Sequence, residues 1–157
     1  MAVRVFREVN RSEGLKPATG VTVIIAGQPL VKATADTVKP VDSKADIAYG
    51  VAAESTGQLP IAPLSGLTAG EGFDYTNFAR GGLVSCFTNG SELELYDDGH
   101  GVPFEDGDTY TLNREVYVDE TSGLITSDSD TDTRKVVGSV TDVEGSPVTR
   151  LRVKFSI

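Results

Sequence analysis

Apolar and polar residues alternate without a break over residues 150–157. Successive side chains of a β-strand point to opposite faces of the sheet, so the two kinds of residue separate onto two faces. One face carries Leu151, Val153, Phe155 and Ile157, and the other carries Arg150, Arg152 and Lys154. The pattern predicts a strand with one buried face, so we expect the end of this sequence to lie within a sheet.

Short apolar runs rich in β-branched residues recur along the chain, bounded by Gly and Pro. They predict extended segments or strands at residues 21–26, 30–33, 37–41, 47–54, 73–80, 83–87, 93–96, 115–119, 124–126 and 135–141. For residues 74–79, a short helical turn is the alternative. Gly50 indicates a bulge or a close packing contact inside its strand. No segment of ten or more residues keeps the helical period, so the fold class expected is mainly β, with little helix, as a small barrel or sandwich.

The chain of 157 residues fits a single domain. Residues 1–20 have the pattern of an extended N-terminal arm, and residues 21–157 that of the β-rich domain. Residues 55–72 hold many Gly and Pro residues with a few apolar residues between them, which is typical of a long loop that packs or makes contacts.

Charge is distributed unevenly along the chain, whose net charge is −9. Residues 1–16 carry +2, and residues 92–132 carry thirteen acidic residues against Arg114. A solvated acidic face is the interpretation that this pattern favours, and the basic N-terminus is suited to meet an acidic protein surface. An acidic body disfavours nucleic acid as a partner.

No stretch of the sequence approaches the roughly 20 apolar residues of a membrane span. The first residues lack the apolar core of a secretory signal. The single cysteine, Cys86, cannot form an internal disulfide, so synthesis in a reducing cytoplasm is expected. Because no segment is apolar enough to span a membrane, no membrane partner is expected either.

Candidate catalytic residues are few. His100 is the only histidine and lies between two glycines, where we expect an exposed turn residue and no Ser-His-Asp triad. Cys86 lies in an apolar run without a basic neighbour, which predicts a buried thiol and no nucleophile. The sequence therefore predicts no catalytic residue, no enzyme activity and no cofactor.

Asp128, Asp130 and Asp132 have the spacing that begins a calcium-binding loop. The loop would need Gly at position 133 and Glu at position 139, where the chain has Thr and Ser, so no metal site is expected. A weak divalent-ion site among the acidic residues is the alternative. A small hydrolase that uses acidic residues stays as a third alternative. Its candidate carboxylates are Asp97, Asp98, Asp106 and Asp108.

Four spaced segments carry a family resemblance: GQPLV at residues 27–31, YGVA at 49–52, VYVDETSGLIT at 116–126 and VVGSV at 136–140, followed by the Arg-rich final strand. In this order they resemble the capsid decoration proteins of tailed bacteriophages, also called cement or head-stabilising proteins. The resemblance covers residues 20–157 and implies a small β-barrel or β-tulip-like single domain. It also implies a structural virion protein that is made in the host cytoplasm and lies on the capsid surface.

Such proteins bind the outer surface of the capsid, often as trimers and sometimes as dimers, and bridge neighbouring major capsid protein subunits. In this chain the resemblance implies a homotrimer, with a dimer as the alternative. An N-terminal arm of this kind can add a strand to an exposed sheet edge of its partner. The capsid-binding residues expected in the arm are Val3, Arg4, Val5, Phe6 and Arg7.

A carbohydrate- or host-binding module of a virion fibre or spike is the alternative from another class. Its site would be the loop at residues 55–72, with Tyr75 and Phe78 nearby. Trp is absent and aromatic residues make up only 7% of the chain, so a stacking platform for sugars is poorly supplied.

Overall fold

The computed structural model of the chain describes residues 3–7, 10–11, 14–56, 83–88 and 90–157. Within these residues it contains twelve strands, in two six-stranded sheets, and no helix. Sheet I has the order β1 (Val3–Arg7), β8 (Glu92–Leu95), β12 (Arg150–Phe155), β11 (Gly138–Glu144), β9 (Glu115–Val118) and β10 (Ile125–Thr126). Sheet II has the order β2 (Asn10–Arg11), β7 (Cys86–Thr88), β6 (Gly50–Ala52), β4 (Pro29–Lys32), β5 (Thr37–Pro40) and β3 (Lys16–Pro17).

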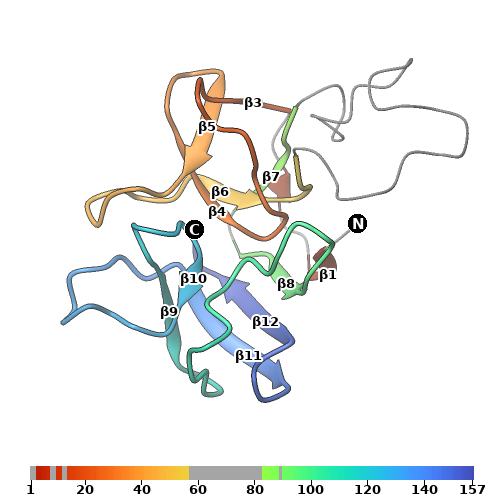
Figure 1. Cartoon of the computed structure of the whole chain (residues 1–157), viewed down its shortest axis with the longest axis vertical. Coiled ribbons are helices and arrows are strands. Elements are labelled where there is room, and N and C mark those ends of the chain that lie inside the picture. Colours follow the sequence, from red (N-terminus) through yellow and green to blue (C-terminus); the bar gives the residue numbers. More distant parts are fainter. Residues whose placement is uncertain (1–2, 8–9, 12–13, 57–82, 89) are drawn as a thin grey trace, which may run out of the picture.

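The two sheets are curled and lie one above the other, with sheet II uppermost in Figure 1. Neighbouring strands are antiparallel except β3 and β5, which are parallel. The predicted fold class, mainly β and barrel-like, is confirmed.

A single cluster of buried side chains joins the sheets. Sheet II contributes Val31, Val51 and Phe87, and sheet I contributes strands β8, β9, β11 and β12. In β12, Leu151, Val153 and Phe155 are at most 2% exposed, while Arg150 and Lys154 are exposed. The predicted alternation of the final strand is therefore confirmed, and its apolar face forms the centre of the core.

The central strands of sheet II, β4, β6 and β7, are largely buried on both faces. The sequence neighbours of Val31, Val51 and Phe87 in these strands, Leu30, Ala52 and Cys86, pack in a second cluster with Ile24, Val38 and Val84. Close packing also explains Gly50, because a Cβ added there would lie 2.8 Å from the carbonyl oxygen of Phe87. The expectation of a close contact at this glycine is confirmed.

A polar contact fixes the β9–β10 turn of sheet I against sheet II. Gln28 is 4% exposed, and its Nε2 donates to the carbonyl oxygen of Gly123 at 3.2 Å. Its Oε1 accepts from the backbone N–H of Ile25 at 3.2 Å. Gly123 has φ +71°, and a Cβ there would lie 2.9 Å from the Cβ of Pro40. Two of the segments that carry the resemblance, residues 27–31 and 116–126, thus meet between the sheets.

The strand predicted at residues 21–26 is wrong. Ile24 forms only an isolated bridge with Thr56. The backbone N–H groups of Ile24 and Ala26 donate to the hydroxyl oxygens of Thr56 and Ser55, at 3.1 and 2.8 Å. Because side chains accept these bonds, the segment needs no strand ladder, despite its β-branched residues.

Candidate functional site

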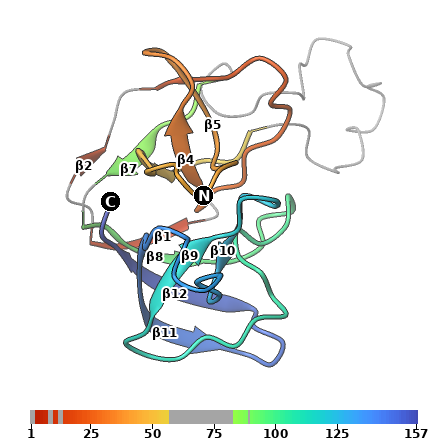
Figure 2. The ribbon, with the colours of Figure 1, turned by 90° about the vertical axis from the view of Figure 1, so that its left-hand side faces the viewer.

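The five residues predicted to bind a capsid form strand β1, at one edge of sheet I (Figure 2). Their backbone pairs with β8 antiparallel, with Val3 opposite Leu95, Arg4 opposite Glu94 and Val5 opposite Leu93. Arg7 pairs with Glu92, so Phe6 is the extra residue of a β-bulge. The predicted arm is extended, and this part of it is paired with its own domain.

The N-terminal segment runs along both sheets. After β1 pairs with β8 in sheet I, β2 pairs with β7 in sheet II, and Leu15 forms a bridge with Val84. The described residues of this segment thus pair antiparallel, in reverse order, with residues 92–95, 87–88 and 84. Strands β1 and β2 are edge strands of sheets I and II, respectively.

The basic face of β12 forms cross-strand ion pairs. Glu94 of β8 is 6% exposed, and its carboxylate lies 3.6 Å from the guanidinium groups of both Arg150 and Arg152. Arg152 also lies 3.7 Å from Asp142 of β11. Three neighbouring strands therefore present alternating charge on the outer face of sheet I, and Arg4 of β1 lies next in register, opposite Glu94.

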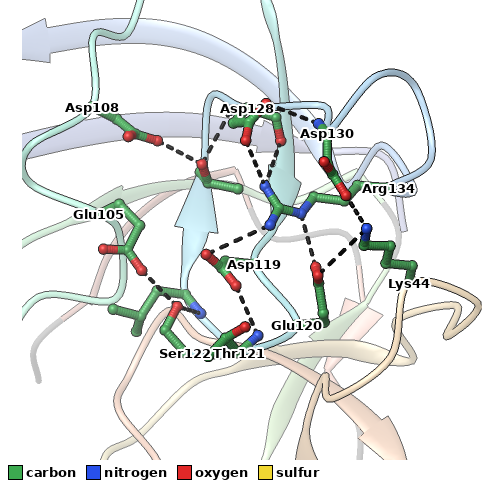
Figure 3. A network of polar contacts seen from close by, with 12 residues as sticks. Lys44, Glu105, Asp108, Asp119, Glu120, Thr121, Ser122, Asp128, Asp130 and Arg134 are labelled. Atoms are coloured by element: carbon green, nitrogen blue, oxygen red, sulfur yellow. Dashed lines mark hydrogen bonds and ion pairs between the residues drawn. The ribbon is translucent and has the colours of Figure 1, made fainter.

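The acidic half of the chain forms a polar network around Arg134, shown in Figure 3. The Arg134 side chain is 9% exposed, and its Nε donates to Glu120 at 2.9 Å. Its other nitrogens lie 3.1 Å from Asp128 and 3.6 Å from Asp119. The hydrogen bond from Arg134, together with its charge, lowers the pKa of Glu120 below its ordinary value.

Lys44 joins this network from the loop between β5 and β6 of sheet II. Its Nζ pairs with Asp130 and lies 3.8 Å from Glu120 (Figure 3). Lysine and arginine thus place two fixed positive charges among four carboxylates. The network connects the acidic loop of sheet I to sheet II.

The calcium-loop pattern at Asp128, Asp130 and Asp132 is replaced by this arrangement. Asp128 pairs with Arg134, and Asp130 pairs with Lys44. The charges of these two carboxylates are therefore balanced by protein cations. Within the described part of the chain, no group of three or more metal-ligating side chains converges.

His100 is buried, which corrects the expectation of an exposed turn residue. Its side chain is 5% exposed, and its Nδ1 lies 3.1 Å from Asp98. The cause is the conformation of the turn. Asp97 accepts from the backbone N–H groups of Gly99 and Gly101, and in this tight turn the His100 ring lies against Asp98. The Nε2 atom has no hydrogen-bond partner among the described residues.

Ser55 completes this small cluster, since its hydroxyl donates to the second oxygen of Asp98. The carboxylate lies between the serine and the histidine, whereas a hydrolytic triad needs the histidine in the middle. Asp98 therefore connects the turn at residues 97–101 to residue 55.

Other candidate residues have structural partners or lie elsewhere. Asp108 accepts from the hydroxyl of Thr126 at 2.6 Å and from the backbone N–H of Ser127 at 2.9 Å. Cys86 is fully buried, as expected. The predicted strand at residues 73–80, with Tyr75 and Phe78, and the loop beyond residue 56 lie outside the described residues.

A polar cleft of about 500 Å³ was missed by the sequence reasoning. It lies between the loop at residues 109–114, strand β9 and residues 127–129. Its hydroxyl, amide and charged residues come from three separate segments, of which two have the composition of an ordinary turn and one is a strand. No signal in the sequence brings them together.

Comparison with family models, with curated proteins and with solved structures gave no match to this chain. In the part of the chain that the structure describes, no helix is long and apolar enough to span a membrane.

Proposed function

We propose that this protein is a structural virion protein that binds the outer surface of a phage capsid and bridges major capsid protein subunits. The observation that carries the proposal is the position of β1, the first strand of the chain, at the edge of sheet I. A strand at a sheet edge offers unpaired backbone groups on which a strand of another protein can pair. The resemblance to decoration proteins supplies the identity of the partner.

The charges of the N-terminal segment support the same proposal. Residues 1–16 carry +2 on a protein whose net charge is −9. A basic edge strand attracts an acidic partner surface, so the protein would bind with this edge toward the partner. The acidic remainder of the domain would then face solvent. Arg4 and Arg7 are the cations of β1 that would pair with capsid carboxylates.

Assembly as a homotrimer would strengthen binding without new contacts, because linked weak sites bind with an increased effective concentration. A dimer would give the same kind of gain with two sites. Light scattering of the purified protein would distinguish the two assemblies from a monomer.

Co-sedimentation with mature heads of its own phage tests the proposal. The wild-type chain should pellet with heads and stay in solution without them. The double variant Arg4→Glu, Arg7→Glu should bind at least about tenfold more weakly. The matched control is Lys32→Glu with Lys135→Glu, which reverses two exposed charges outside the strands of sheet I and should bind as the wild type does.

Two results would contradict the proposal. Failure of the wild-type chain to pellet with any head of its own phage would remove the capsid as the partner. Equal binding by the arm variant and the control would remove β1 as the contact.

A further inference from the structure

The polar cleft beside β9 has preformed walls. In β9, Val116 and Val118 are buried in the core, so Glu115 and Tyr117 point to the outer face. The loop before β9 is fixed by hydrogen bonds from Asn113 N to Val140 O and from Val140 N to Arg114 O, both 2.9 Å.

The opposite wall and the floor are fixed as well. Ser127 on the far side is held by its bond to Asp108. Tyr110 lines the cleft and is 6% exposed, and its hydroxyl donates to the carbonyl oxygens of Glu105 and Ile125, at 2.9 and 3.0 Å. The volume of about 500 Å³ falls in the range of roughly 300–1,000 Å³ that small-molecule sites occupy.

Several polar groups in the cleft are available to a ligand. Among the described residues, no carboxylate lies within ion-pair distance of the exposed Arg114, and the side chains of Thr109, Thr111 and Asn113 make no internal hydrogen bond. Arginine offers five donors in a planar fork, and asparagine and threonine offer both donors and acceptors.

The remaining groups balance these donors. Glu115 provides an acceptor in the lining and also accepts from the Tyr117 hydroxyl at 3.0 Å. Burial and the bond to Glu115 raise the pKa of Tyr117, so its hydroxyl stays protonated at neutral pH. One positive and one negative side chain therefore line the cleft with matched charge.

These features select one class of ligand. A polar lining disfavours an apolar molecule, and one charge of each sign, which together give no net charge, disfavours a strongly charged one. A neutral polyhydroxylated molecule satisfies both, because its neighbouring hydroxyl groups donate to Glu115 and accept from Arg114 and Asn113. The half-buried ring of Tyr117 adds a surface for the apolar face of a sugar ring.

We propose that the cleft bounded by residues 109–117 and 127–129 binds a neutral saccharide. The site lies on described residues and shares none with β1. It gives a protein on a particle surface a second, sugar-directed contact, independent of what the sheet edge binds.

NMR titration of the purified full chain with lactose, N,N′-diacetylchitobiose and sucrose, each to millimolar concentration, tests the proposal. At least one disaccharide should shift the amide signals of residues 109–117 and 127–129 in a saturable manner. Inorganic phosphate, added separately, should leave those signals in place.

Variants locate the site. Arg114→Gln and Glu115→Gln should each weaken saccharide affinity about tenfold, since each removes one charged hydrogen-bonding partner. Lys154→Gln, which removes a cation from the same sheet outside the cleft, should bind as the wild type does. Unchanged amide spectra elsewhere in the chain show that each variant is folded.

Three results would overturn the proposal. These are the absence of saturable shifts with every disaccharide, saturable shifts with phosphate alone, and wild-type affinity in both cleft variants. None of them bears on capsid binding, which the sedimentation experiment measures separately.

Discussion

Gly123 is the residue through which the β9–β10 turn approaches sheet II, and the substitution Gly123→Ala should destabilise the protein strongly. Two separate effects contribute. The backbone at Gly123 has φ +71°, a conformation that costs an alanine about 1–2 kcal/mol. The new methyl group would also lie 2.9 Å from the Cβ of Pro40 and 3.0 Å from Nε2 of Gln28.

The packing effect can be estimated from these distances. Forcing an extra methyl group into a close-packed site costs about 1–3 kcal/mol. Together with the backbone effect, Gly123→Ala should lower the free energy of unfolding by about 2–5 kcal/mol, a large share of the roughly 5–15 kcal/mol of a typical domain.

Two other glycines separate the two effects. Gly20 has φ +87° with no atom within 4 Å of an added Cβ, so Gly20→Ala should show the backbone effect alone, about 1–2 kcal/mol. Gly107 has open space and no positive φ, so Gly107→Ala should be neutral or stabilising by up to about 1 kcal/mol.

Urea denaturation monitored by circular dichroism measures all three variants. The expected order of stability is Gly107→Ala, then Gly20→Ala, then Gly123→Ala. If Gly123→Ala is no less stable than Gly20→Ala, the close contact between the turn and sheet II is absent and the reasoning fails.

Three further predictions concern the polar network, the buried tyrosine and the core. Arg134 lowers the pKa of Glu120 below 4.5. The stability contributed by this ion pair is therefore present above pH 4.5 and is lost as the pH falls through the lowered pKa. The difference in urea midpoint between wild type and Arg134→Gln should therefore shrink on acidification below about pH 4, and a pH-independent difference would contradict this. Burial raises the pKa of Tyr110 above 10.0, so the stability linked to its protonated hydroxyl falls as pH rises beyond 10. The free energy of unfolding of Tyr110→Phe should fall less than that of the wild type over that pH range. An absorbance titration of the wild type should show a tyrosine that ionises only on unfolding, and the variant should lack it. Leu151→Ala, at a fully buried position, should cost about 2–5 kcal/mol in urea denaturation, whereas Lys154→Ala should stay within about 0.5 kcal/mol.

The parts of the fold that sequence reasoning predicted correctly are those in which one local pattern decides the outcome. In β12, strict alternation and burial of one face agree, so the strand and its core residues follow from the sequence. The segment around Ile24 is also rich in β-branched residues. Its backbone N–H groups nevertheless donate to the hydroxyls of Ser55 and Thr56, which are 29 and 32 residues away from the donors. Propensity does not indicate which acceptor a backbone N–H will find.

The sites were harder to predict because their residues are distant in sequence. Lys44 meets Asp130 across 86 positions, and no pattern near either residue points to the other. The burial of His100 depends on how Asp97 caps the turn around it, which is a three-dimensional property of five residues. The cleft near Arg114 requires three segments to converge.

Strand β8 lies between β1 and β12, so it pairs on one side with residues 3–7 and on the other with residues 150–155. In a growing polypeptide, Leu93 and Leu95 therefore lack their β12 partners until Leu151 and Val153 have been synthesised. Sheet I forms its centre late, through contacts between residues far apart in sequence, and such topologies fold slowly. During that interval, the apolar residues of β8 lack their β12 partners, and a chaperone can bind them.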